Sequence, residues 1–153
     1  MQRNHHDHRN TKEHLRANAV FLIVAASWGM CVGLLGAFAG IGPQSAIVAA
    51  APHSVIGFVE AHGLALILGV LLWRAEPLRS WHLTAAAVHV LLGTANLVFW
   101  QIFIAADMLT GGYITTSLHW LFVALQLGAA FVAGKAPSSV PIGGRYQPYG
   151  ASV

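Results

Sequence analysis

The sequence predicts an all-α, polytopic membrane protein: an up-and-down bundle of four transmembrane helices with both termini in the cytoplasm. Of its 153 residues, 56% are hydrophobic and only 8% are charged, which is too apolar for a soluble domain of this size. Four apolar runs each approach the ~20 residues that cross a hydrocarbon layer of ~30 Å. Membrane-spanning strands are only about ten residues long and alternate in polarity, so the runs are expected to be helices.

The placement of the basic residues predicts the orientation of these spans. The expected spans are Ala19–Gly40, His53–Trp73, Trp81–Ala105 and Ile114–Gly134. All 8 Lys and Arg residues lie before the first span, between the second and third, or after the fourth. Lys and Arg near span ends are retained on the cytoplasmic side, so we expect a cell (inner) membrane protein with both termini inside. The net charge of +3 then reflects topology and does not argue for nucleic acid.

The two ends of the chain differ in composition from the spans. Residues 1–17 are predicted to be a polar, His-rich cytoplasmic tail, whose imidazoles could capture Cu, Ni or Zn weakly. A flexible tail is the preferred interpretation, because no fixed ligand spacing stands out. Residues 18–135 form the predicted membrane domain, and residues 136–153, rich in Pro, Gly, Ser and Tyr, are expected to be a flexible tail. The first apolar run is too long for a cleaved secretory signal.

The first span carries a face of small residues. Glycines recur there at helical spacing, at Gly29, Gly33, Gly36 and Gly40. Small residues at this spacing let helices approach closely in a membrane. The face is expected to pack inside the bundle or against a second subunit, and a homodimer through it is our prediction.

Polar stripes on the other spans are expected to face the bundle interior, because polar groups at membrane depth avoid lipid. On the third span the stripe is His82, His89, Gly93, Asn96 and Trp100. On the fourth it is Gly112, Thr116, His119 and Gln126. On the second, one face carries His62, Ala65, Leu66 and Gly69, with Glu60 on the opposite side. Ionisable groups at this depth are functional-site candidates by default.

Depth selects the histidines that are expected to cooperate. Counted from the outer span ends at ~1.5 Å per residue, His62 and His119 lie about 10 to 14 Å below the outer surface. Asn96 falls in the same layer. His89 lies roughly 10 Å deeper by the same rise, without a ligand partner, so a structural or proton-relay role is expected. His82 and His53 lie near the interfaces and are expected to be solvated.

The second and fourth helices of a four-helix ring lie on a diagonal of about 13 Å, given neighbours 8 to 10 Å apart. Two imidazoles that bind one iron from opposite sides need a backbone separation of about that size. We therefore expect His62 and His119 to hold a bis-histidine haem, with Gly69 leaving room for the porphyrin and Asn96 in the same layer. A transition-metal site completed by Glu60 or the lone cysteine, Cys31, is an alternative, and structural polar packing is another.

The segment 60–69, EAHGLALILG, resembles the second helix of haem-copper oxidase subunit I, in which a His-Gly pair followed by large apolar residues carries a low-spin haem ligand. Histidines on the second and fourth helices are also similar to one half of haem A synthase. The resemblance implies a b-type haem site at His62 and, by topology, at His119. The spans lack the His-x-His pair and the copper-binding histidines of the oxidases, so dioxygen reduction is not implied. The paired cysteines of some haem A synthases are also absent.

Three functional classes therefore remain. A small b-type haem protein would act in electron transfer, gas sensing or haem handling. A membrane enzyme would use His62, Glu60, Asn96 and His119 as a polar or metal-binding layer, with Glu60 and Asn96 as candidate catalytic residues. An accessory subunit would bind a redox partner or a larger membrane complex. Glu60, expected to be neutral, could donate a proton near His62, bond another subunit, or be structural.

Overall fold

The computed structural model describes residues 2–134, with side chains from residue 10 onward. Within this part of the chain there are helices and no strand. The helices are α1 (Gln2–Ala39), α2 (Ser45–Ala50), α3 (Ser54–Arg74), α4 (Arg79–Val98), α5 (Trp100–Ala105) and α6 (Leu109–Ala133). Four of them, α1, α3, α4 and α6, are long and apolar enough to cross a membrane. The predicted all-α bundle of four membrane-spanning helices is confirmed.

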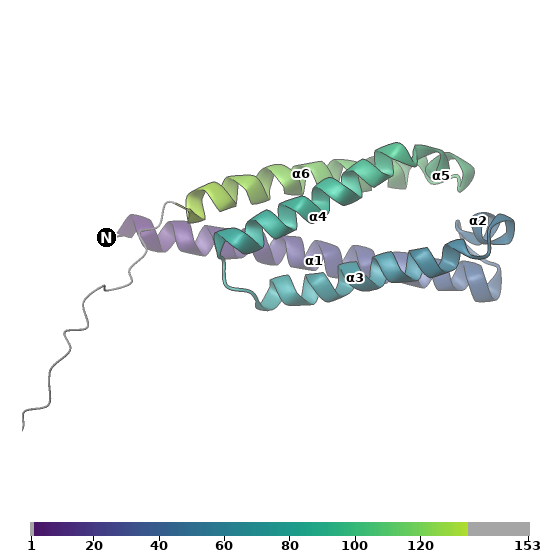
Figure 1. Cartoon of the computed structure of the whole chain (residues 1–153), viewed down its shortest axis with the longest axis horizontal. Helices are drawn as coiled ribbons and strands as arrows, with labels where there is room; N and C mark the ends of the chain where they lie inside the picture. The colour runs from purple at the N-terminus through teal and green to yellow at the C-terminus, as the bar shows by residue number, and fades with distance from the viewer. Residues whose placement is uncertain (1, 135–153) are drawn as a thin grey trace, which may run out of the picture.

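The four long helices form two layers, α1 with α3 and α4 with α6, and α1 also contacts α6 (Figure 1). The start of α1, the α3–α4 connection and the end of α6 lie at one end, and the short helices α2 and α5 lie at the other. We call the first the basic end, because its segments carry Lys12, Arg16, Arg74 and Arg79. We call the other the far end.

The helix α1 extends through the segment predicted to be a separate tail. It is continuous from Gln2, and Thr11 and Leu15 are 5% and 1% exposed. Leu15 continues the stripe of Ala19 and Leu22 at spacings of four and three residues, so the same face stays buried beyond the apolar run. The prediction that a flexible tail ends at residue 17 is therefore wrong, because the backbone is helical on both sides of that residue. The predicted C-terminal tail, 136–153, lies outside the described residues.

The third predicted span is divided into two helices. The helix α4 ends at Val98, because the backbone of Phe99 (φ −100, ψ 30) is not helical, and α5 follows as one short helix. Asp107 then takes a positive φ of 54° and reverses the chain into α6. The predicted span Trp81–Ala105 is therefore too long, because its last residues form the separate helix α5.

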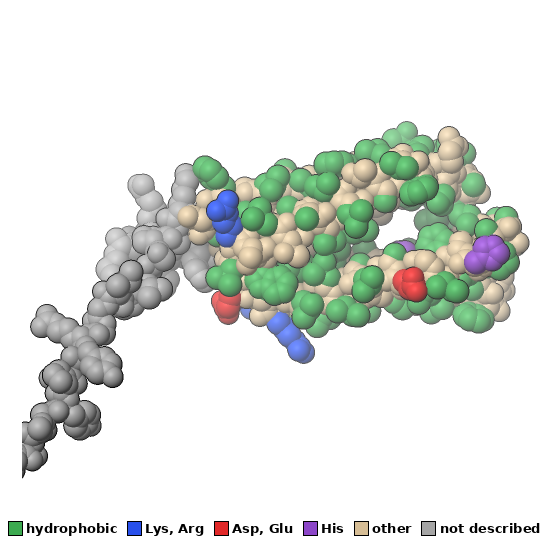
Figure 2. Space-filling model, viewed as in Figure 1, with side chains coloured by type: hydrophobic (Ala, Val, Ile, Leu, Met, Phe, Trp, Pro, Cys, Tyr) green, Lys and Arg blue, Asp and Glu red, His purple; other side chains and the backbone are tan. Residues whose placement is uncertain are grey.

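The tightly packed core lies in the half of the bundle near the basic end. Its buried cluster consists of Leu15, Ala19, Leu22, Leu72 and Ala85. Gly69 lets α3 approach α1 there, since a Cβ at this position would lie 2.8 Å from Ile23 Cγ1. Toward the far end the two layers separate, and the space-filling view shows an opening between them (Figure 2).

The glycine face of α1 is used within the chain. A Cβ at Gly29 would overlap the ring of His62, and Cβ atoms at Gly33 and Gly36 would each lie 3.2 Å from atoms of Gln44 or Ser45. Gly40 takes a positive φ of 65° just after α1 ends. The surface predicted to form a homodimer is therefore largely covered by α3 and by the segment leading into α2.

Candidate functional site

Two histidines from the α4·α6 layer meet at the centre of the bundle. His89 Nδ1 and His119 Nδ1 lie 2.9 Å apart in a hydrogen bond, and the two side chains are 0% and 8% exposed. Gly93, one turn along α4 from His89, makes this approach possible, because a Cβ there would lie 3.3 Å from His119 Cβ. We call His89 and His119 the central pair.

Asn18 of α1 fixes the protons of the central pair. Its Oδ1 lies 3.0 Å from His89 Nε2, and Asn18 is fully buried. An amide oxygen only accepts, so His89 Nε2 carries the hydrogen and, in the neutral ring, His89 Nδ1 is the acceptor. His119 Nδ1 must then donate to His89 Nδ1. The unprotonated nitrogen of His119 is therefore Nε2, which has the lone pair that a metal or a proton would take.

Aromatic rings hold the central pair in place. Phe122 of α6 stacks on His89 with ring centroids 5.1 Å apart, and Phe21 of α1 contacts His119 edge-on at 5.6 Å. Phe21 and Phe122 also stack on each other at 4.9 Å. This packing restricts the rotation of both imidazoles, which favours a fixed orientation of His119 Nε2.

A second polar layer lies two turns nearer the basic end. His82 Nδ1 is 2.6 Å from Gln126 Oε1, and Gln126 Nε2 donates to the carbonyl oxygen of His14 at 3.1 Å. His82 Nδ1 is thus the donor, and its Nε2 carries the lone pair. The expectation that His82 is solvated is wrong, because α1 extends past the predicted start of its span and covers this level. His82 is 0% exposed.

Three buried polar atoms around these layers have no hydrogen-bond partner among the described residues. They are Asn18 Nδ2, His82 Nε2 and Thr116 Oγ1. Thr116 lies one turn from His119 on α6, toward the far end. Since buried polar groups in native proteins are nearly always paired, these atoms mark where the bundle interior can bind something further.

His62 does not face His119. Its Nδ1 donates to the Phe58 carbonyl oxygen at 2.7 Å, and its ring lies against Gly29 of α1. Gly29 follows Asn18 by eleven residues, so His62 lies about 16 Å further toward the far end than the central pair, at 1.5 Å per residue. The predicted depth match of His62 with His119 is wrong, and so is the expectation that His89 lacks a partner. The glycine contacts between helices set their register, and counting from span ends misses them.

The other predicted site residues are dispersed. Ile23 and Ala19 occupy the space beside Gly69 that was expected for a porphyrin. Asn96 Nδ2 donates to Thr115 Oγ1 at 3.4 Å, one turn from His119. Glu60 and Cys31 are both exposed and do not join His62. No group of three or more His, Cys, Asp or Glu side chains in the described part of the chain could hold a metal ion.

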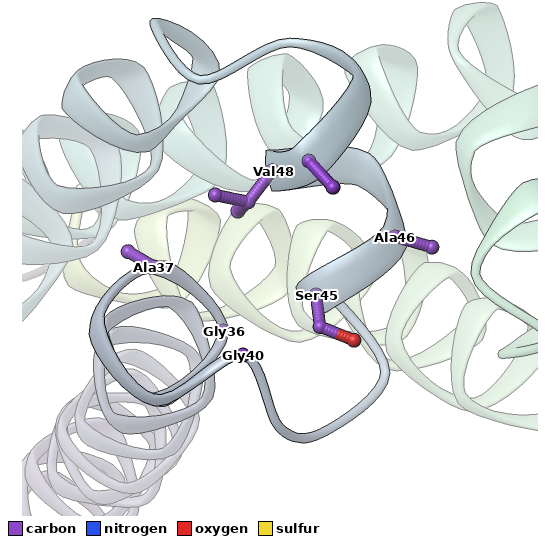
Figure 3. Close-up of a pocket in the computed structure, with 7 residues that line it drawn as sticks. Gly36, Ala37, Gly40, Ser45, Ala46 and Val48 are labelled. Atoms are coloured by element: carbon purple, nitrogen blue, oxygen red, sulfur yellow. The ribbon is translucent and has the colours of Figure 1, made fainter.

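One cavity lies away from this site. It has a volume of about 450 Å³ at the far end, between the end of α1 and α2, and is lined by Gly36, Ala37, Gly40, Ser45, Ala46, Val48 and Ala49 (Figure 3). None of these side chains titrates. A smaller cavity of about 190 Å³ reaches Thr116, and Leu97, Trp100, Tyr113 and Ser117 complete its lining.

Sequence reasoning missed Asn18 and Phe21 as site residues. Asn18 directly precedes the first predicted span and Phe21 lies near its start, and neither was singled out from the sequence. A signal was present, because Asn18 is the one strongly polar residue on the stripe of Leu15 and Leu22. No protein-family model, curated protein or solved structure matches the chain.

Proposed function

We propose that this protein is a small b-type haem protein of the cell membrane, in which His119 Nε2 binds the iron. One observation supports this above all: the hydrogen bonds from His119 through His89 to Asn18 leave the lone pair on His119 Nε2. Metal-ligating histidines almost always donate their other ring N–H to a fixed partner, which orients the ring and raises its basicity. Here a buried imidazole is that partner, and an amide in turn holds the imidazole.

The proposal keeps haem b but changes the ligands expected from the sequence. His62 has the same protonation pattern, since its Nδ1 donates to a carbonyl, but it lies at another depth. If His119 were the one histidine that holds the haem, the bound group could also take up a diatomic gas or another small ligand. Gas sensing or haem handling is therefore favoured over electron transfer through a bis-His haem.

Space for the porphyrin lies on the far-end side of His119. The small cavity that Thr116 lines begins one turn away from His119 on α6. Figure 2 shows that the two layers are also separated toward the far end. The unpartnered Thr116 hydroxyl would face the bound group from α6. Aromatic residues that line the cavity, Trp100 and Tyr113, supply an apolar wall of the kind haem sites use.

The basic end is proposed to face the cytoplasm of a cell (inner) membrane, because Lys and Arg near span ends are retained on that side. The haem space would then open toward the outer half of the bilayer. The central pair would lie between this space and the cytoplasmic side.

A proton-handling membrane enzyme is the second candidate, favoured by the direct contact between two imidazoles. In this case His119 Nε2 accepts a proton from a substrate, and His89 stabilises the imidazolium that forms. The polar layer then consists of His119, His89 and Thr116. It replaces the layer of Glu60, Asn96 and His62 expected from the sequence.

Visible absorption of the purified protein, prepared from cells supplied with haem and then titrated with haemin, tests the proposal. We expect a Soret band in the wild type that is lost in His119→Ala and kept in His62→Ala. His53→Ala, at an exposed histidine, is the matched control. A wild-type protein that stays colourless after titration contradicts the proposal, and the proton-handling enzyme then remains as the candidate function. Loss of the band in both His62→Ala and His119→Ala would restore the bis-His site.

A further inference from the structure

An acidic residue lies on the outside of the bundle, in the part that faces lipid. Glu60 is exposed on α3, six residues after the helix starts, which places it about 9 Å inside the far end at 1.5 Å per residue. Glu60 makes no hydrogen bond or ion pair within the described part of the chain. Carboxyl groups in membrane spans almost always face a bundle interior or pair with another group.

The surface around Glu60 is apolar and has small residues beside the carboxyl. Ile56, Leu64 and Ile67, at helical spacing from Glu60, are 64%, 68% and 59% exposed. Gly57 and Ala61 are exposed too, and nothing lies within 4 Å of a Cβ at Gly57. We call Ile56, Gly57, Glu60, Ala61, Leu64 and Ile67 the Glu60 face. Small residues on a membrane helix allow close approach of another helix.

We propose that the Glu60 face is the interface of a homodimer, in which the two α3 helices pack in parallel across a two-fold axis. Such an axis along the membrane normal places a residue opposite its own copy at the same depth. A neutral carboxyl group has one O–H donor and a free acceptor oxygen, so two Glu60 side chains satisfy each other. The chemistry is self-complementary, and the second copy needs no other group.

The distribution of charge favours a second copy joined by two acids over a salt bridge. Within the described residues, every Lys and Arg lies in the segments at the basic end, away from the depth of Glu60. A second copy therefore offers no cation at this level. One polar pair in an apolar helix interface also fixes its register, as a buried Asn does in coiled coils.

This interface is independent of the haem proposal. It differs from the homodimer expected through the glycines of α1, because Gly29, Gly33 and Gly36 already contact other parts of the chain. It lies on the face of α3 opposite the contact of His62 with α1, and it includes neither residue of the central pair.

The test measures self-association of full-length protein in lipid vesicles, by energy transfer between labelled copies as lipid dilutes them. The wild type is expected to dimerise. Glu60→Gln should keep the dimer, because two amides also satisfy each other. Glu60→Leu should weaken association about tenfold, since one interhelical polar contact is worth about 1–2 kcal/mol. Gly57→Leu should also weaken association, because a bulky side chain there keeps the second helix from approaching closely. Gly128→Leu, at an exposed glycine of α6 with nothing near its Cβ, should have no effect.

Cysteine cross-linking locates the interface independently. In a Cys31→Ser background, Ala61→Cys should form a disulfide-linked dimer on oxidation, and Leu127→Cys, at an exposed site on α6, should not. A monomeric wild type, or a dimer that Glu60→Leu and Gly57→Leu leave unchanged, would overturn the proposal. Cross-linking from Leu127→Cys alone would place the interface on α6 and overturn it too.

Discussion

The hydrogen bond between His89 and His119 joins the Nδ1 atoms of the two rings, 2.9 Å apart. One Nδ1 must carry a hydrogen and the other must not, so the two neutral imidazoles are opposite tautomers. Asn18 determines which ring carries its hydrogen on Nδ1. Its amide oxygen can only accept a hydrogen bond, so His89 has its hydrogen on Nε2 and His119 has its hydrogen on Nδ1. Asn18 on α1 thus sets the tautomer of His119 on α6, through His89 on α4. Among the described residues, the His119 ring makes one hydrogen bond, through Nδ1, and none reaches its Nε2.

Asn18→Leu is expected to destabilise the protein. It leaves the buried His89 Nε2–H without an acceptor, at a cost of about 1–3 kcal/mol in the free energy of unfolding. Unfolding by SDS in mixed micelles measures this. Asn10→Leu, at an exposed position of the same helix, is the control and should change stability by less than about 0.5 kcal/mol. Equal effects of the two variants would count against the network.

The second polar layer should behave as a coupled pair. Gln126→Leu alone leaves His82 Nδ1–H buried and unpaired, with an expected loss of about 1–3 kcal/mol. The double variant His82→Phe, Gln126→Leu should be more stable than the sum of the two single changes by about 0.5–3 kcal/mol. The same SDS titration gives this coupling energy. Strict additivity would mean that the two side chains do not interact.

A second substitution at His62 should restore the stability that is lost by a substitution at Gly29. A Cβ at Gly29 would overlap the His62 ring, so Gly29→Ala is expected to cost about 1–3 kcal/mol by overpacking. His62→Ala in the same chain removes the overlapping ring and should recover most of that loss. Unfolding of the two single variants and the double variant gives the comparison. If Gly29→Ala is neutral on its own, the register between α1 and α3 described above is incorrect.

The membrane-spanning helices could be predicted from the sequence, but the positions of the helices relative to one another along the bundle could not. Apolar runs and the distribution of Lys and Arg predict four spans, because span length and charge bias are properties of single segments. Which histidines meet depends on how helices slide past one another. The contacts at Gly29, Gly69 and Gly93 set this, and no hydropathy pattern records them.

The polar stripes were partly informative. They placed His89 on one inward stripe and His119 on another, and both side chains are buried. The stripes did not predict that His89 and His119 contact each other, since the depth of each residue was counted from span ends that do not lie at the same level. Asn18 was overlooked because it stands where the apolar run meets the polar segment 1–17, although α1 continues unbroken through both.

The most direct test of the account is the nitrogen NMR signature of His119 in protein labelled with ¹⁵N-histidine, without added haem. We expect a neutral His119 ring with hydrogen on Nδ1 and an unprotonated Nε2, together with a His89 ring that carries hydrogen on Nε2. Assignment follows from the loss of signals in His119→Ala and His89→Gln. A His119 ring that carries its hydrogen on Nε2 would contradict the directed network, and with it the ligand role proposed for that atom.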